Sequence, residues 1–375
     1  MHVGLNLVYL VPGETGGTET YARELIPELV RLAPGARFTA FINRETAAAA
    51  GELDWLAGVE TMTVPVAASS RGQWVRGEQQ LLPLLARRAG VDLVHSLANT
   101  GPLWGQFKRV LTVHDIHFKL VPEAHTLPMR LGMSVLVPLA AGRSHRIITD
   151  AQSTAWELQK HLGADATAID VIPLGLGGRS EVSPRPEGEL RERLAIGSRP
   201  IVLCVAAKRP HKNLIRLISA MSLIPAGRRP LLAIPGYSTH HDQELIAHAQ
   251  SLNLAEDVRL FSWLEAEDLE GLYAVASCLV CPSLHEGFGL PVLEAMARGL
   301  PVACSGRGAL AEVAGDAAVL FDPLSPRAIA QAVERLLADR DTAAHLAAAG
   351  RERAGHYTWA STAGATLRSY ASALT

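Results

Sequence analysis

Short apolar runs rich in β-branched residues alternate with segments of helical length along the whole chain of 375 residues. The runs are nearly continuous in apolar residues, as strands of a parallel sheet covered on both faces must be. This alternation predicts the α/β class. The runs expected to form strands are VGLNLVYL, ARFTAFI, VDLVHS, RVLTVHDI, HRIITD, AIDVIPLG, PIVLCVAA, RPLLAIPG, DVRLF, SCLVCPS, LPVAC and AAVLF.

The alternation lapses between Gly175 and Pro200, where GLGGRSEVSPRPEGELRERLAIGSRP has the composition of a domain linker followed by a short helix. We therefore expect an N-terminal domain over 1–177 and a C-terminal domain over 178–355, both doubly wound and Rossmann-like. Ligands of such sheets bind at the carboxyl ends of the strands, so the domains are expected to face a central cleft. The last segment, 356–375, has helical apolar spacing and could pack back on the first domain.

The charge pattern excludes some partners. The net charge is −2 with both signs interspersed, so no global field gathers nucleic acid or an anionic membrane.

The start MHVGLNLVYLVPG lacks signal-peptide features, and the uncharged stretch Leu131 to Gly142 is too short to span a bilayer. We expect a cytoplasmic protein with at most peripheral contact at the inner face of the membrane. The segment SSRGQWVRG around Trp74 could be an acceptor-binding or membrane-touching loop.

Cysteine spacing suggests neither zinc nor a disulfide. Cys278 and Cys281 form a CxxC, but they lie in the apolar run ASCLVCPS, and Cys204 and Cys304 also lie in strand-like runs. Without a second close pair, buried free thiols are expected.

The stretch HEGFGLPVLEAMARGLPV, 285–302, predicts an anion site. A loop, HEGFG, precedes a helix with Pro291 in its first turn and Gly299 just past its end. The helix N-terminus would then present the amides of four successive residues to an anion such as phosphate: Gly287, Phe288, Gly289 and Leu290. Glu286 from the loop and Glu294 from the first helical turn could bind sugar and ribose hydroxyls. In the simpler alternative, Glu294 complements the helix dipole and Glu286 caps a loop.

EGFGLPVLEAMARGLPV, extended by GALAEVAGDAAVLFDP, resembles the E-x7-E signature of the GT4 family of retaining glycosyltransferases, which have the GT-B fold. The resemblance implies two Rossmann-like domains and transfer of a sugar from a nucleotide-sugar donor. It also implies that Glu286 approaches the donor sugar and that Glu294 binds the nucleotide ribose.

The segment VAAKRPHKNLIRLISAM places Lys208, Arg209, His211 and Lys212 between a strand and a helix. Such cations could neutralise a diphosphate leaving group without a metal, although a solvated basic loop is the alternative. Similar transferases carry a Gly-Arg pair here, then Lys followed by Gly or Asn. Lys212-Asn213 matches the second half, but Ala206-Ala207 replaces Gly-Arg. Lys208 or Arg209 must therefore supply the missing arginine's charge, and the sequence does not decide between them.

VPGETGGTETYARELIPELVRL predicts a strand, a glycine loop and an amphipathic helix capped by Thr18. Gly16 and Gly17 resemble the GG loop of the family, which lies over the donor diphosphate and reaches the acceptor. The loop is not GxGxxG, which argues against a dehydrogenase.

RVLTVHDIHF ends a strand with His114. A neutral His there can donate to a hydroxyl, and a core His is the alternative. The resemblance implies that His114 contacts the donor sugar near the scissile bond. HDI followed by Pro122-Glu123 is similar to the mannosyltransferase-rich subgroup. Metal binding by His114 with His117, or by His240-His241-Asp242, lacks a third ligand at fitting spacing.

VRLFSWLEAEDLEGLY contains Trp263-Leu264, where the resemblance places the nucleotide base and where a core aromatic is the alternative. The sequence thus predicts a metal-independent retaining hexosyltransferase with catalytic groups His114, Glu286, Lys212 and Arg209. The predicted enzyme needs no cofactor besides its nucleotide-sugar co-substrate. GDP-mannose is the favoured donor, and UDP-glucose or another UDP-hexose is the alternative.

The acceptor, bound mainly by the N-terminal domain, is expected to be a glycan, a lipid-linked sugar or a small molecule. A sugar-nucleotide 2-epimerase of the same fold and a non-catalytic nucleotide-binding protein are the other classes considered. Monomer and homodimer both remain open.

Overall fold

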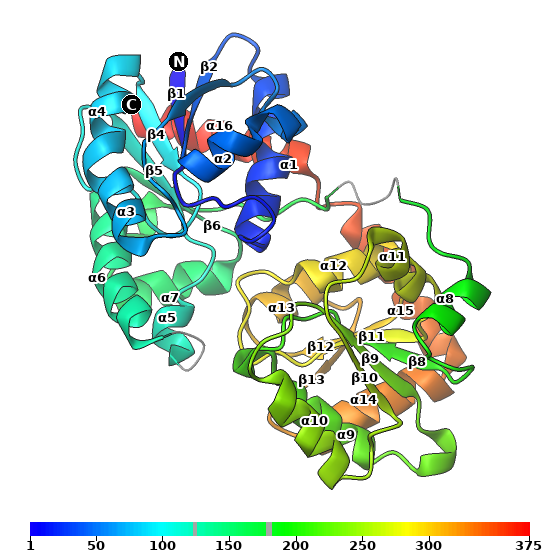
Figure 1. The fold of residues 1–375 in the computed structure, drawn as a ribbon. Helices are drawn as coiled ribbons and strands as arrows, with labels where there is room; N and C mark the ends of the chain where they lie inside the picture. Colours follow the sequence, from blue (N-terminus) through cyan, green and yellow to red (C-terminus); the bar gives the residue numbers. More distant parts are fainter. Residues whose placement is uncertain (123–125, 178–181) are drawn as a thin grey trace. The chain divides into compact units, whose positions relative to one another are not determined.

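A computed structural model of the chain describes residues 1–122, 126–177 and 182–375 (Figure 1). It divides into two compact units, unit 1 with Met1–Gly177 and Tyr357–Thr375, and unit 2 with Gly178–His356. The boundary expected after residue 177 coincides with this division. The C-terminal segment was expected to start at residue 356, which is one residue before Tyr357, where the chain returns to unit 1.

Unit 1 contains a seven-stranded parallel sheet in the order β3-β2-β1-β4-β5-β6-β7. Its strands are β1 (His2–Leu7), β2 (Arg37–Ile42), β3 (Glu60–Thr63), β4 (Leu93–Ser96), β5 (Lys108–Thr112), β6 (Arg146–Thr149) and β7 (Ile169–Val171). Its helices are α1 (Gly17–Leu32), α2 (Arg44–Ala49), α3 (Arg71–Arg76), α4 (Leu82–Ala89), α5 (His117–Leu120), α6 (Leu127–Arg143), α7 (Gln152–Leu162) and α16 (Trp359–Leu374).

The sequence did not predict β3. Its residues, ETMT, are mostly exposed at the edge of the sheet. An edge strand is not covered on both sides and needs no continuous apolar run, so the pattern that marks the interior strands is absent from it.

Unit 2 contains a six-stranded parallel sheet in the order β10-β9-β8-β11-β12-β13. Its strands are β8 (Ile201–Leu203), β9 (Leu231–Pro235), β10 (Val258–Phe261), β11 (Cys278–Cys281), β12 (Val302–Ser305) and β13 (Val319–Phe321). Its helices are α8 (Glu187–Arg193), α9 (Leu214–Ser222), α10 (Asp242–Ser251), α11 (Ala266–Val275), α12 (Leu290–Ala297), α13 (Gly308–Ala314), α14 (Pro326–Ala338) and α15 (Arg340–Ala354).

In unit 2, α9 packs beside α10 and α14, α12 packs beside α13 and α15, and α8 packs beside α11. The sheet begins at β8 and grows outward on both sides, so the strand order reverses between β8 and β11. These features confirm the predicted α/β class with doubly wound, Rossmann-like sheets. Ligands of such sheets bind where the order reverses, which directs attention to the loops that follow β8 and β11.

The last helix, α16, belongs to unit 1 and packs beside α1 (Figure 1). Tyr370 is fully buried, and its hydroxyl lies 2.7 Å from Nδ1 of His95 on β4. The hydroxyl of Thr362 donates to the carbonyl of Pro173 at 2.8 Å. Buried polar groups cost free energy unless they are paired, so these bonds fix where the helix can dock.

All four cysteines are free and buried, as predicted. Burial raises the pKa of Cys278 to about 12 and that of Cys281 to about 11, which keeps both as thiols. Within the described ranges, no helix combines the length and the apolar character needed to cross a bilayer.

Candidate functional site

An ion pair lies at the carboxyl edge of the unit 2 sheet. β8 and β11 are hydrogen-bonded neighbours, so the loops that follow them start side by side. These loops bring Nζ of Lys212 to 2.6 Å from Oε1 of Glu286, and the hydroxyl of Ser283 donates to the same oxygen at 2.6 Å. Two residues predicted separately from the sequence are thus direct partners.

The pair is charged at neutral pH. Burial alone would raise the pKa of Glu286, but the charge of Lys212 and the hydrogen bonds from Lys212 and Ser283 lower it to about 2. Burial would likewise lower the pKa of Lys212, yet the neighbouring carboxylate raises it above its ordinary value. The edge of the sheet therefore holds a fixed cation and a fixed anion.

Asn213 explains why Gly or Asn follows the lysine in this motif. Its backbone is left-handed, with φ of 59°, a conformation that Gly and Asn adopt most readily. Its side-chain amide donates to the carbonyls of Pro282, at 2.9 Å, and Pro323, at 2.7 Å. Asn213 thereby anchors the Lys212 loop to the loop that carries Glu286.

Helix α12 begins beside this pair, as predicted, with Pro291 in its first turn and Gly299 just past its end. Its N-cap residue, Gly289, has φ of 115°, and no side chain caps the helix. Across the described ranges, no group accepts a hydrogen bond from the amides of Gly287, Gly289 or Leu290. These N–H groups can therefore bind an anion. The ring of Phe288 is buried and holds the loop against the unit.

Glu294 lies in the second turn of α12, because the helix starts at Leu290, and the predicted first-turn position is wrong. The hydroxyl of Tyr273 donates to its Oε2 at 2.8 Å, and the guanidinium of Arg298 lies 4.5 Å from the Tyr273 ring centroid. A carboxylate beyond the first turn interacts weakly with the helix dipole, so the dipole explanation for Glu294 loses its support.

Lys208 and Arg209, which the sequence did not distinguish, have different surroundings in the structure. Lys208 is fully buried, and its ammonium donates to the carbonyls of Gly236, at 2.5 Å, and Phe261. Burial lowers its pKa to about 8. The expectation that Lys208 faces an anion does not fit these contacts, because it joins the ends of β9 and β10. Arg209 is exposed and forms no ion pair within the described part of the chain, so its guanidinium is available to a ligand.

Trp263 is not a core aromatic. It is 64% exposed and packs against the exposed ring of Tyr237, with centroids 4.8 Å apart and planes at 35°. Tyr237 follows β9, and the Trp263-Leu264 pair follows β10, so both aromatics lie at the carboxyl edge of the sheet. An exposed pair of rings at this edge can stack on a planar ligand group.

The glycine loop of unit 1 leads into α1, whose N-cap is Gly16 with φ of 67°. The predicted cap, Thr18, instead lies inside the helix, and its hydroxyl donates to the carbonyl of Thr15 at 3.3 Å. A Cβ added at Gly16 or Gly17 would meet no atom within 4 Å. The loop therefore has room for a ligand next to its backbone.

His114 follows β5 and has a partner for each ring nitrogen. Nδ1 lies 2.6 Å from Oδ2 of Asp150, and Nε2 donates to the carbonyl of Leu97 at 2.9 Å. The carbonyl of Leu97 can only accept, so Nε2 carries hydrogen, and a carboxylate beside Nδ1 favours hydrogen there as well. Burial would lower the pKa of His114, but Asp150 raises it above the ordinary value. Both ring nitrogens are thus engaged within the unit, so the ring has no unengaged N–H for the hydroxyl that the sequence led us to expect as its partner.

Two partners were missed in the sequence. Asp150 follows β6, the neighbour of β5, and Ser283 follows β11. Both could have been found as polar residues directly after apolar runs, HRIITD and SCLVCPS. Tyr21 on α1 contacts the His114 ring edge-on with centroids 4.8 Å apart, which links the glycine-loop helix to this pair.

The other sequence candidates form local contacts. His117 pairs with Asp115 at 3.4 Å and His241 with Glu244 at 2.7 Å. Among the residues that the structure describes, no group of three or more His, Cys, Asp and Glu side chains could hold a metal ion. The segment around Trp74 is helix α3, with Trp74 packed against an apolar cluster, rather than a loop. Glu123 of the Pro122-Glu123 motif lies outside the described residues.

Two doubly wound parallel sheets of this kind are the architecture of GT-B glycosyltransferases. The chain superimposes on the Anabaena protein HepE in complex with UDP-glucose with a TM-score of 0.77, at 19% identity, over 99% of this chain and all of the other. The family described as "Glycosyltransferase Family 4" matches residues 15–176, and "Glycosyl transferases group 1" matches residues 187–353. The chain belongs to the family 4 glycosyltransferases, and it is a transferase enzyme.

Two similar proteins indicate which glycosyltransferases this chain resembles. O-antigen chain mannosyltransferase B of Escherichia coli is 29% identical over 269 residues, which is 70% of each chain. D-inositol 3-phosphate glycosyltransferase of Segniliparus rotundus is 29% identical over 308 residues, 80% of this chain and 65% of that relative. The chain is thus similar to enzymes that transfer sugars to different acceptors.

Proposed function

We propose that the chain is a metal-independent retaining hexosyltransferase whose nucleotide-sugar donor binds at the carboxyl edge of the unit 2 sheet. The observation that carries this proposal is the Lys212–Glu286 ion pair beside the uncapped start of α12. Departure of a nucleoside diphosphate builds up negative charge. Lys212, Arg209 and the amides of Gly287, Gly289 and Leu290 would stabilise that charge.

The remaining polar atoms suit the rest of the donor. Oε2 of Glu286 accepts no hydrogen bond from the described residues and would accept from sugar hydroxyls. The Glu294 carboxylate, oriented by Tyr273, would bind ribose hydroxyls. Trp263 with Leu264 would hold the base, and Tyr237 adds a second ring to that surface.

Unit 1 would supply the acceptor side. The open loop at Gly16 and Gly17 would cover the diphosphate and reach the acceptor. His114, whose pKa is raised by Asp150 and whose ring nitrogens are both engaged, would act near the donor sugar through positive charge. A central cleft that joins these groups to the unit 2 site stays a prediction, as does a cytoplasmic location.

Retention would proceed on one face of the sugar. The bond between the anomeric carbon and the phosphate oxygen breaks, the acceptor oxygen bonds to the same face, and the leaving phosphate oxygen takes the acceptor proton. Glu286 is paired with Lys212 and has a pKa of about 2, which suits substrate binding rather than proton transfer. No covalent nucleophile is needed in this scheme.

GDP-mannose is the proposed donor, supported by similarity to O-antigen chain mannosyltransferase B. A UDP-hexose is the second candidate, because the structurally similar HepE was solved with UDP-glucose. The acceptor would be a glycan, a lipid-linked sugar or a small molecule.

A donor panel tests the proposal. The protein is incubated with GDP-mannose and UDP-hexoses in EDTA, and thermal stabilisation and donor hydrolysis are measured. One donor should stabilise the fold through linkage and be hydrolysed slowly. Arg209→Gln should weaken that donor's binding about tenfold. Arg327→Gln removes another exposed arginine of unit 2 and should leave binding unchanged.

Three outcomes would contradict the proposal. A response that appears only with Mg²⁺ would show that a metal, rather than these cations and amides, neutralises the diphosphate. Release of an epimerised sugar would identify a 2-epimerase. Stabilisation without turnover in the presence of any acceptor would identify a nucleotide-binding protein.

A further inference from the structure

Helix α6 (Leu127–Arg143) is apolar but mostly uncovered. Its buried residues, Val137, Ala140 and Ala141, all lie in its second half, and none lies between 127 and 136. Large apolar side chains recur every four residues with high exposed fractions: Leu127 58%, Leu131 58%, Val135 57% and Leu139 44%. Residues four apart are neighbours on a helix surface, so these four form one stripe about 18 Å long. A helix so widely apolar is normally covered.

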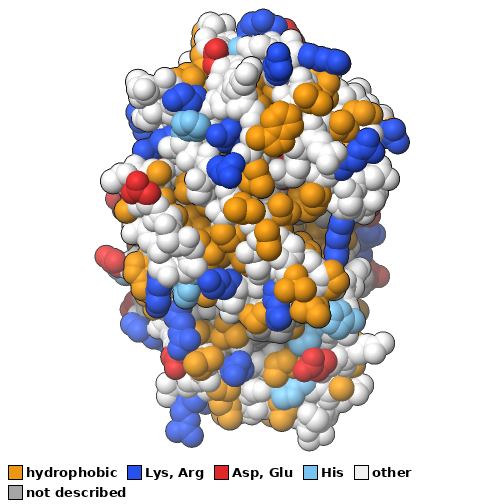
Figure 2. Space-filling view, turned by 90° about the vertical axis from the view of Figure 1, so that its left-hand side faces the viewer, with side chains coloured by type: hydrophobic (Ala, Val, Ile, Leu, Met, Phe, Trp, Pro, Cys, Tyr) orange, Lys and Arg blue, Asp and Glu red, His pale blue; other side chains and the backbone are white. Residues whose placement is uncertain are grey.

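Cations that form no salt bridge with any residue the structure describes flank the stripe. α6 itself contains Arg130 and Arg143 and no acidic residue. Nε of Arg109 donates to the carbonyl of Arg143 at 2.9 Å, which places a further cation at the end of the helix. In the described ranges, neither these arginines nor Lys119 forms a salt bridge with a carboxylate. Figure 2 views the side on which α6 lies in Figure 1 and shows hydrophobic side chains interspersed with Lys and Arg.

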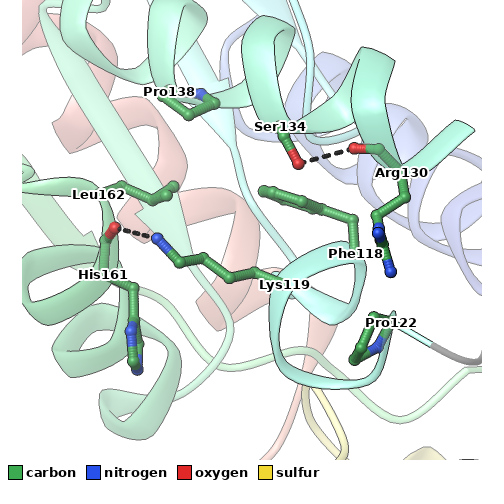
Figure 3. A pocket seen from close by; sticks show the side chains of 8 residues that line it. All are labelled: Phe118, Lys119, Pro122, Arg130, Ser134, Pro138, His161 and Leu162. Carbon is green, nitrogen blue, oxygen red and sulfur yellow. Dashed lines mark hydrogen bonds between the residues drawn. The ribbon is translucent and has the colours of Figure 1, made fainter. Parts of the chain in front are cut away.

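A pocket of about 490 Å³ lies beside the stripe, between α5, α6 and the end of α7 (Figure 3). Phe118 and Leu162 provide apolar walls, and Arg130 lies at its edge. Nζ of Lys119 donates to the carbonyl of His161 at 2.7 Å across the pocket. Apolar walls with cations at the edge suit a group that is part hydrocarbon and part anion.

Trp104 adds an interfacial anchor. Its ring is 48% exposed, and the guanidinium of Arg143 donates to the carbonyl of the preceding residue, Leu103, at 3.2 Å. An exposed Trp next in sequence to a residue that Arg143 contacts suits the boundary between lipid headgroups and acyl chains, where Trp side chains are enriched.

We propose that this face, formed by Leu127, Leu131, Val135 and Leu139 with Arg109, Arg130 and Arg143, docks on an anionic phospholipid bilayer. Helices that lie in the plane of a membrane combine such an apolar stripe with flanking cations, which are attracted to anionic headgroups. A second copy of the chain fits this face less well. A two-fold interface would bring the same unpaired cations of both copies together, and like charges oppose such contact.

Vesicle co-sedimentation tests the proposal. The wild-type protein should bind vesicles of phosphatidylcholine mixed with phosphatidylglycerol more tightly than vesicles of phosphatidylcholine alone. The double variant L131Q/V135Q should bind the mixed vesicles about tenfold more weakly, because less apolar surface is buried in the membrane. The matched control L223Q/I246Q changes two exposed apolar residues of unit 2 and should bind like the wild type. R130Q/R143Q should lose the preference for anionic vesicles.

Equal binding by L131Q/V135Q and its control, or equal wild-type binding to neutral and anionic vesicles, would overturn the proposal. So would a wild-type dimer that L131Q/V135Q converts to a monomer, since the stripe would then be a subunit interface. Stabilisation by GDP-mannose or UDP-glucose is measured on every variant. Because it reports on unit 2, failure of membrane docking remains distinguishable from failure of the proposed transferase activity.

Discussion

Both units place an ion pair at the carboxyl edge of a parallel sheet, yet the two pairs differ in what they leave open. In unit 2, Lys212 and Glu286 lie 2.6 Å apart, and beside them an oxygen of Glu286, the start of α12 and Arg209 lack partners among the described residues. In unit 1, His114 and Asp150 are also 2.6 Å apart, but both ring nitrogens are engaged within the unit, and the atom of the pair left without a partner among the described residues, Oδ1 of Asp150, is buried. The unit 2 pair thus leaves a carboxylate oxygen and neighbouring groups open to a ligand, whereas the open oxygen of the unit 1 pair is buried.

Lys212→Ala should have the largest effect. Removing the cation that faces the leaving diphosphate should lower the transfer rate about 10²–10³-fold. It also leaves Glu286 buried without its counter-ion, which should destabilise the fold by about 3 kcal/mol. Steady-state transfer and urea denaturation measure the two effects. Lys160→Ala, which removes a lysine lying over Trp156, is the control. A Lys212→Ala enzyme with the wild-type rate would remove the distinction between the two pairs.

Glu286→Gln should change how stability depends on acid. The pKa of Glu286 is lowered from 4.5 to about 2 on folding, so the unfolded chain binds its proton first. Its contribution is therefore present above pH 4.5 and is lost as the pH falls toward 2, with roughly 2 kcal/mol already lost at pH 3. The difference between the urea midpoints at pH 6 and pH 3 should be smaller in Glu286→Gln than in the wild type. Parallel acid loss in both proteins would mean that Lys212 does not hold the carboxylate ionised.

Asp150→Asn should lower the free energy of unfolding more at pH 6 than at pH 9, and its effect should be smaller than that of Glu286→Gln. The pKa of His114 is raised above 6.5 by Asp150, so its contribution is complete below pH 6.5 and is lost as the pH rises through the folded-state pKa. The variant should lose about 1.5 kcal/mol at pH 6 and less at pH 9. Urea unfolding at both values measures this difference. An equal loss at pH 6 and pH 9 would show that the imidazolium is not what Asp150 stabilises.

Much of the fold could be predicted from periodicity because interior strands of parallel sheets must be apolar on both faces. Strand β3 was not predicted, because an edge strand need not be apolar on both faces. At helix starts the sequence was less informative. Thr18 looked like a cap, but Gly16 holds the left-handed backbone that precedes α1, and Glu294 lies one turn later than expected. Cap and turn positions depend on backbone angles that several residue types can adopt.

The site could be predicted only in part. Glu286 and Lys212 were recognisable from their motifs, but their pairing joins positions 74 residues apart and depends on β8 lying next to β11. Lys208 and Arg209 are adjacent cations that no local pattern distinguishes. Their different burial follows from the positions of β9 and β10, whose terminal carbonyls bind the lysine.

The sequence by itself determined the α/β class, the division near residue 177, and the glycine loop and helix of the proposed anion site, because each depends on local periodicity or backbone freedom. Only the tertiary structure decided the partners that raise the pKa of His114, the burial of Lys208 and the exposure of the α6 stripe. These properties depend on which distant groups surround a side chain. Desolvation and hydrogen bonding act through space, so residues far apart in the chain set them.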